Sequence, residues 1–168
     1  YDTESKNQYI KSLHTTDEVK AITAARIIFS EITGKIARGE RIVSITAKEL
    51  VDKYLNMESR RISDKPKDGI TPHTFRVKKQ WFNIWLKYIE SIGHKTTPID
   101  KIKPERTRDF GYWFFQLPKS GTYKGDNEDR SKETINNAIT EIKRCYKQVA
   151  LRDRYISSDQ MPQIDRLT

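Results

Sequence analysis

The stretch 131–151 constrains the fold more than any other part of the chain, because its apolar residues recur at helical spacing. They form one stripe, which consists of Ile135, Ala138, Ile139, Ile142, Cys145, Tyr146 and Val149. An apolar stripe of this kind is stable in water only when other elements cover it. The stretch therefore predicts a long amphipathic helix that packs against further helices.

The adjoining face of this helix is polar and basic. About 100° further round lie Asn136, Thr140, Lys143 and Lys147, with Arg144 beside them. Lys and Arg neutralise phosphates, whereas Asn and Thr can hydrogen-bond to phosphate or to base edges. This face suits a polyanion, and the alternative is an ordinary solvated helix face.

Composition supports a helical protein with a polyanionic partner. Only 35% of the residues are hydrophobic and 33% are charged, with 7 Gly and 6 Pro, which favours an all-α helical bundle. The net charge is +9, and residues 69–168 contribute +7 of it. Nucleic acid is the natural partner of such a surplus. No apolar run approaches the roughly 18–20 residues of a membrane span, and the single cysteine, Cys145, fits a reducing cytoplasm.

Two helices are expected in the N-terminal part. The first begins at Thr15, with Glu18 as its capping-box partner, and carries an apolar stripe that includes Ile22, Phe29 and Ile36. The second begins at Thr46, where Glu49 completes another capping box. We predict that these two helices form a small antiparallel pair within an N-terminal subdomain, residues 1–62.

Residues 63–70 have the composition of a linker and mark a predicted domain boundary. A helix then begins at Thr71-Pro72 and runs to Ile92, and a third core helix begins at Pro104. A loop over 118–130 precedes the basic helix. The predicted domain covers residues 71–156, and a polar tail follows over 157–168.

The segment 71–156 resembles the core-binding domain of phage-type integrases, the tyrosine recombinases. The resemblance rests on Trp81 and Trp85 in one helix, on the step Thr134-Ile135-Asn136 that begins the last helix, and on the ending Ala150 to Ile156. It implies a SAM-like helical bundle that grips duplex DNA at the core recombination site. It also implies that strand exchange belongs to a separate catalytic domain with a tyrosine nucleophile, so this chain is not itself an enzyme. The resemblance further implies that the parent protein forms a tetramer on DNA, and we expect the fragment alone to be a monomer.

The sequence offers one set of residues that imitates catalytic machinery. His73 and Arg76 match the family's His-x-x-Arg box, and several tyrosines, Tyr88, Tyr112, Tyr123, Tyr146 and Tyr155, are possible nucleophiles. The match lies on the first turn of an amphipathic helix without the family's other groups, so we expect no catalytic residue here. The three histidines are isolated, and no phosphate-binding glycine loop is present. We therefore expect no metal, no cofactor and no small-molecule substrate.

The predicted partner is double-stranded DNA, in the cytoplasm and nucleoid. Fifteen residues are predicted to contact it: Thr74, Arg76, Lys78, Lys79, Lys119, Lys124, Arg130, Lys132, Thr134, Asn136, Asn137, Thr140, Lys143, Arg144 and Lys147. Asn136, Asn137 and Thr140 are expected to reach base edges, and Lys78 is the weakest member because it falls within an apolar stripe. Two alternatives stay open: a helical protein–protein module with a basic face, and a transcription regulator. A helix-turn-helix is disfavoured because the stretch between Leu117 and Ser131 is too long for the usual turn.

Overall fold

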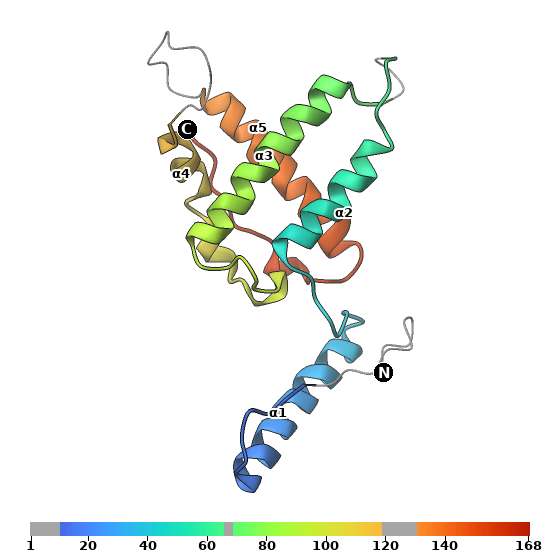
Figure 1. Ribbon diagram of the computed structural model, residues 1–168, viewed down its shortest axis with the longest axis vertical. Coiled ribbons are helices and arrows are strands. Elements are labelled where there is room, and N and C mark those ends of the chain that lie inside the picture. The colour runs from blue at the N-terminus through green and yellow to red at the C-terminus, as the bar shows by residue number, and fades with distance from the viewer. Residues whose placement is uncertain (1–10, 66–68, 119–130) are drawn as a thin grey trace. The chain divides into compact units, whose positions relative to one another are not determined.

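The computed structural model describes residues 11–65, 69–118 and 131–168, and these residues fold into helices and loops without a β-strand (Figure 1). The α-helices are α1 (Glu18–Ala37), α2 (Ala47–Ser59), α3 (Pro72–Ser91), α4 (Phe110–Gln116) and α5 (Lys132–Cys145). Short 3-10 turns η1 (Ile99–Lys101), η2 (Pro104–Thr107) and η4 (Ser158–Gln160) connect or follow them, and the π-helical turn η3 (Tyr146–Leu151) continues α5. The predicted all-α class is confirmed.

The chain divides into two compact units, residues 1–44 and residues 45–168. The predicted boundary at 62/63 is therefore wrong. The ends of the expected linker are tied together, because the Ile70 N–H donates to the Arg61 carbonyl at 2.9 Å and the Ser63 N–H donates to the Ile70 carbonyl at 3.0 Å. These bonds join residues at the two ends of the connection, and both ends belong to the second unit.

In the first unit, α1 stands without a core of its own. Asp17, not Thr15, caps the helix, and its side chain accepts a hydrogen bond from the Lys20 N–H. None of the helix residues is buried, and the expected core residues Ile22, Phe29 and Ile36 are 47%, 68% and 57% exposed. The predicted stripe exists, but a single helix cannot cover its own apolar face.

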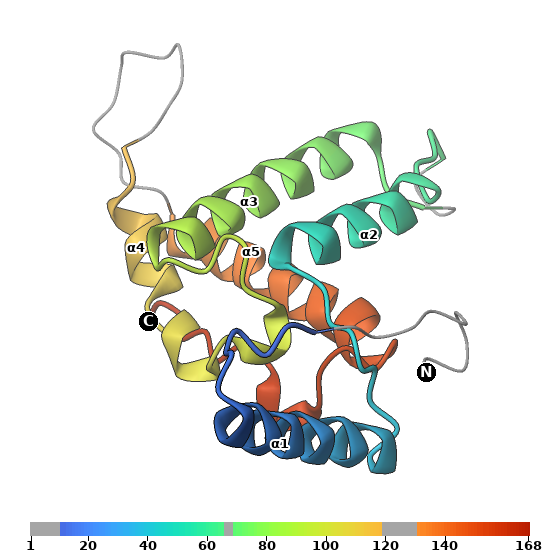
Figure 2. The same ribbon diagram turned by 60° about the horizontal axis from the view of Figure 1, so that its bottom comes forward.

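The second unit is built on α2, α3 and α5. Sequence signals set the helix starts as expected: Thr46 and Glu49 form a capping box for α2, and Thr71 caps α3 with proline at its first position. The helices α2 and α3 run in opposite directions, and α5 crosses behind both (Figures 1 and 2). The apolar face of α2 is buried in this bundle. The predicted N-terminal subdomain of α1 and α2 is not one of the two units, because α1 belongs to the first unit and α2 to the second.

Aromatic residues fill the middle of the bundle. Trp85 is fully buried and meets the rings of Phe110 and Tyr146 edge to face, at centroid distances of 5.1 Å and 6.1 Å. Tyr88 packs against Phe110 in the same way and donates its hydroxyl to the Arg106 carbonyl. The edge-to-face geometry adds to the stability gained by burying these rings. This core joins α3, α4 and η3 through direct ring contacts.

The last residues are more than a polar tail. Residues 161–168, which we call the C-terminal strap, bury Ile164 and Leu167 in the same core. A Cβ at Gly111 of α4 would lie 3.1 Å from the Asp165 carbonyl oxygen, so glycine permits this close approach. The segment 157–168, expected as a polar tail, therefore includes a part that packs on the bundle, because two apolar side chains and the backbone of the strap have partners there.

Candidate nucleic-acid interface

The main candidate site is a cleft of about 750 Å³ between α2, α5 and η3. We call it the cationic cleft, and it is lined by Met57, Glu58, Arg61, Thr140, Lys143, Arg144, Lys147, Gln148, Arg152 and Met161. Five of these side chains are basic and one is a carboxylate. Such an imbalance on a concave surface concentrates positive potential and attracts anions.

Three structural elements place the five cations. Arg61 lies in the turn that follows α2, so it reaches the cleft only because α2 docks on the bundle. Lys143 and Arg144 lie on the last turn of α5, and Lys147 follows on η3. Arg152 stands directly after η3 and pairs with Asp153 at 2.8 Å. The cleft therefore depends on tertiary packing and not on one helix face alone.

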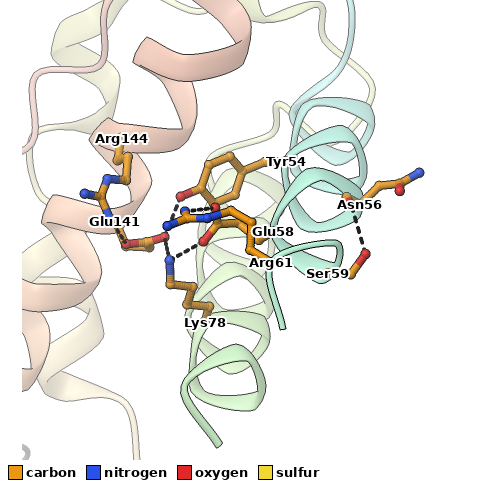
Figure 3. A network of polar contacts seen from close by, with 8 residues as sticks. All are labelled: Tyr54, Asn56, Glu58, Ser59, Arg61, Lys78, Glu141 and Arg144. Atoms are coloured by element: carbon orange, nitrogen blue, oxygen red, sulfur yellow. Dashed lines mark hydrogen bonds and ion pairs between the residues drawn. The ribbon is translucent and has the colours of Figure 1, made fainter. Parts of the chain in front are cut away.

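A set of ion pairs connects residues of this cleft to the buried Lys78 (Figure 3). The Lys78 ammonium of α3 contacts Glu58 at 2.5 Å and Glu141 at 2.6 Å. Each carboxylate also contacts an arginine of the cleft: Glu58 meets Arg61 at 2.6 Å, and Glu141 meets Arg144 at 3.7 Å. We call these five residues the buried ladder.

Hydrogen bonds favour the ionised form of Glu58 in the ladder. Burial acts to raise the pKa of Glu58, but hydrogen bonds from Lys78 and Arg61 outweigh burial and lower that pKa below its usual value. Burial, assisted by the hydrogen bond to Glu141, raises the pKa of Tyr54, so the phenol stays protonated and donates to that carboxylate at 2.6 Å. Glu58 is thus ionised and the Tyr54 hydroxyl remains a donor.

Four predicted contact residues gather in the cleft: Thr140, Lys143, Arg144 and Lys147. Lys147 is exposed and makes no hydrogen bond or ion pair with another described side chain. Arg144 is also exposed, and its pairing with Glu141 is long at 3.7 Å. These two side chains are exposed cations of the cleft, whereas Lys143 is only partly exposed.

Lys78 does not face solvent. Its side chain is 6% exposed and is held between Glu58 and Glu141. The prediction that Lys78 contacts DNA is therefore wrong, for the reason its position in an apolar stripe already indicated. A lysine at a core position is stable only when carboxylates pair with it.

The C-terminal strap occupies part of the face expected to read bases. The Asn136 amide donates to the Leu167 carbonyl at 2.9 Å and accepts from the Leu167 N–H at 3.0 Å, so it is not available to a base edge in this structure. Lys143 donates to the Ile164 carbonyl at 2.9 Å, and Lys132 donates to the Thr168 carbonyl. Arg166 of the strap donates to the Thr140 hydroxyl at 3.1 Å.

The remaining predicted residues lie elsewhere. Thr74, Arg76 and Lys79 are exposed on the first turns of α3 and do not line the cleft. Thr134 and Asn137 are exposed on α5, where Thr134 shares a hydrogen bond with the capping Ser131. Three further residues, Lys119, Lys124 and Arg130, lie outside the described residues.

Sequence reasoning missed Arg61 and Arg152, together with the two methionines of the cleft. Arg152 follows Lys143, Arg144 and Lys147 in the sequence, but it comes five residues after Lys147, which is more than one α-helical turn. Arg61 offered no comparable signal, because only the docking of α2 beside α5 brings it to the cleft.

The described residues that imitate a recombinase active site lie on several elements of the fold. His73 and Arg76 are exposed at the start of α3. Burial raises the pKa of Tyr88 and of Tyr146, which opposes formation of a phenolate. Tyr123 lies outside the described residues. Within the described part of the chain, no three His, Cys, Asp or Glu side chains are grouped to hold a metal ion.

Comparisons with known proteins add no assignment: no protein-family model, no curated protein and no solved structure matches this chain. Over the residues that the structure describes, no helix combines the length and the apolar character of a membrane span.

Proposed function

We propose that this chain is a non-catalytic module that binds duplex DNA through the cationic cleft. The observation that carries the proposal is the gathering of five basic side chains in one cleft whose single carboxylate, Glu58, is itself paired with Lys78 and Arg61. Phosphates are spaced regularly along DNA, so several cations in one cleft can neutralise neighbouring phosphates at once.

Charge distribution supports the same partner. Residues 45–168 contain 25 Lys and Arg against 17 Asp and Glu, a net charge of +8 within the unit that forms the cleft. The exposed cations Arg76 and Lys79 of α3 are additional candidates for phosphate contact. Contacts of this kind position a protein on DNA without reading its sequence.

We further propose that the parent protein is a phage-type tyrosine recombinase, in which this module grips the core site and a separate domain cuts and rejoins the strands. Support comes from the step Thr134-Ile135-Asn136 at the start of the basic helix and from the ending Ala150 to Ile156. A DNA partner also favours the cytoplasm and nucleoid as the location.

The test is a salt titration of binding to a labelled random duplex. Replacing the cations of the cleft in Arg144→Ala, Lys147→Ala, Arg152→Ala should flatten the slope of log affinity against log salt by about two to three units. The matched control is Lys48→Ala, Lys87→Ala, Lys95→Ala, which removes the same charge from exposed positions outside the cleft.

Equal slopes for the two triple variants would show that net charge, and not the cleft, drives binding. If the chain fails to bind duplex and binds a polyglutamate peptide instead, the alternative of a protein–protein module with an acidic partner is favoured.

A further inference from the structure

Lys78 has an unusual place for a lysine in a basic protein, because it lies directly beneath the cationic cleft without reaching it. Its side chain is 6% exposed and contacts two carboxylates, Glu58 of α2 and Glu141 of α5 (Figure 3). Both carboxylates are themselves almost fully buried. Lys78 therefore cannot touch a phosphate, and its charge must act through these two groups.

Each carboxylate of the buried ladder divides its two oxygens between Lys78 and one arginine. Glu58 gives Oε2 to Lys78 and Oε1 to Arg61, and Glu141 gives Oε1 to Lys78 and Oε2 to Arg144. The two arginines remain 50% and 54% exposed at the cleft. The ladder thus connects one buried cation to two accessible ones.

The charge balance of the ladder depends on Lys78. Three cations and two carboxylates leave one positive charge, which is available only at the exposed arginines. Without Lys78, the two nearly buried carboxylates would face only the two arginines, and no other cation of the ladder would balance their charge. Glu58 and Glu141 would then neutralise the two arginines, which would bind an external anion more weakly.

We propose that Lys78 is a positioning residue of the cationic cleft: it balances Glu58 and Glu141, so that Arg61 and Arg144 can offer their charge to a DNA phosphate. The inference rests on the proposed function and deepens it. Tyr54 has a supporting role, because its hydroxyl donates to the same Glu141 oxygen that faces Lys78.

The test measures binding of the full chain to a labelled random duplex over a range of salt concentrations. Lys78→Met should flatten the slope of log affinity against log salt by about two units, since two arginines cease to neutralise phosphates. The control is Lys48→Met, which removes the same charge from an exposed lysine that also pairs with a carboxylate, Asp52, at 2.6 Å. It should leave the slope unchanged, because Lys48 lies outside the cleft.

A second variant restores the charge balance without the lysine. In Lys78→Met with Glu58→Gln the ladder again has one net positive charge, and the slope should return toward that of the parent chain. A loss of packing alone would not be repaired in this way. The proposal is overturned if Lys78→Met matches Lys48→Met, or if the double variant binds no better than Lys78→Met.

Circular dichroism melts of every variant identify the temperatures at which it is folded. If Lys78→Met does not fold, Glu58→Gln alone carries the test: it removes a competitor for Arg61, so it should steepen the slope, and a flatter slope overturns the proposal. A parent chain that binds no duplex overturns the proposed function and this inference together. A parent chain that binds while Lys78→Met has no effect overturns this inference alone.

Discussion

Glu58 is a carboxylate with no exposed side-chain surface, and its contacts explain why a charged group can occupy that position. Removing an ionised group from water is costly unless hydrogen bonds and opposite charges replace the lost hydration. Lys78 supplies one such contact at 2.5 Å and Arg61 another at 2.6 Å. Since both contacts require the ionised form, folding is linked to the protonation of this side chain.

The direction of that linkage predicts a pH dependence. Because the pKa of Glu58 is lowered in the folded state, its contribution to stability is present above its unfolded value of 4.5 and is lost as the pH falls through the folded value. Glu58→Gln should therefore destabilise the protein at pH 7, and the deficit should shrink as the pH is lowered toward 3. Urea denaturation at both pH values measures this, with the exposed Glu133→Gln as the control. An equal deficit at the two pH values would contradict the link to ionisation.

At the scale of the element, the polar face of α5 has a structural role, because its side chains bind the backbone of the C-terminal strap. Ile164 and Leu167 enter the core, and Lys143 and Asn136 of α5 donate hydrogen bonds to the backbone carbonyl groups of these same two residues. The same amide and ammonium groups that suit a polyanion also suit peptide carbonyls, because both ligands offer oxygen acceptors. This shared chemistry is why the sequence could not separate a strap-binding residue from a DNA-binding one.

Substitution of Asn136 tests directly whether α5 holds the strap in place. Asn136→Ala removes both hydrogen bonds to the Leu167 backbone, and we expect a loss of about 1–2 kcal/mol in the free energy of unfolding. Asn137→Ala, at the neighbouring exposed position, should change that free energy by less than about 0.5 kcal/mol. Urea melts of the two variants decide the matter. If Asn136→Ala binds DNA more weakly than Asn137→Ala and the two variants are equally stable, Asn136 is instead a base-reading residue.

The starts of α2, α3 and α5 were predictable from local chemistry. The elements against which each segment packs were not. The capping residues Thr46 and Thr71 and the stripe around Ile139 each act within a few residues, so periodicity and capping rules identify them. The segment 63–70 has the composition of a linker, and only the backbone hydrogen bonds of Ser63 and Ile70 distinguish it from one. The strap was missed because two apolar residues in a polar stretch give no periodic signal.

Across the whole molecule, charge and core are concentrated in the same unit. Residues 45–168 contain every residue of the buried core and every residue of the cationic cleft. The sequence predicted three of the five cations of the cleft, because Lys143 and Arg144 on α5 and Lys147 on η3 belong to one basic series. Arg61 is separated from them by some eighty residues of sequence, so only the folded bundle shows that it belongs to the same site.

This concentration predicts that residues 45–168 fold and bind DNA without residues 1–44. The first unit buries none of the residues of α1, so its removal takes no side chain from the core. The shortened chain keeps a net charge of +8 out of +9, and it retains all ten cleft residues. We expect a single cooperative thermal transition and a slope of log affinity against log salt within about one unit of the full chain, because no cleft cation is lost. Calorimetry and the random-duplex titration check the two halves of this expectation. A shortened chain that folds but loses most of its salt dependence would place the DNA contacts in the first unit, and would move the functional surface away from the cleft.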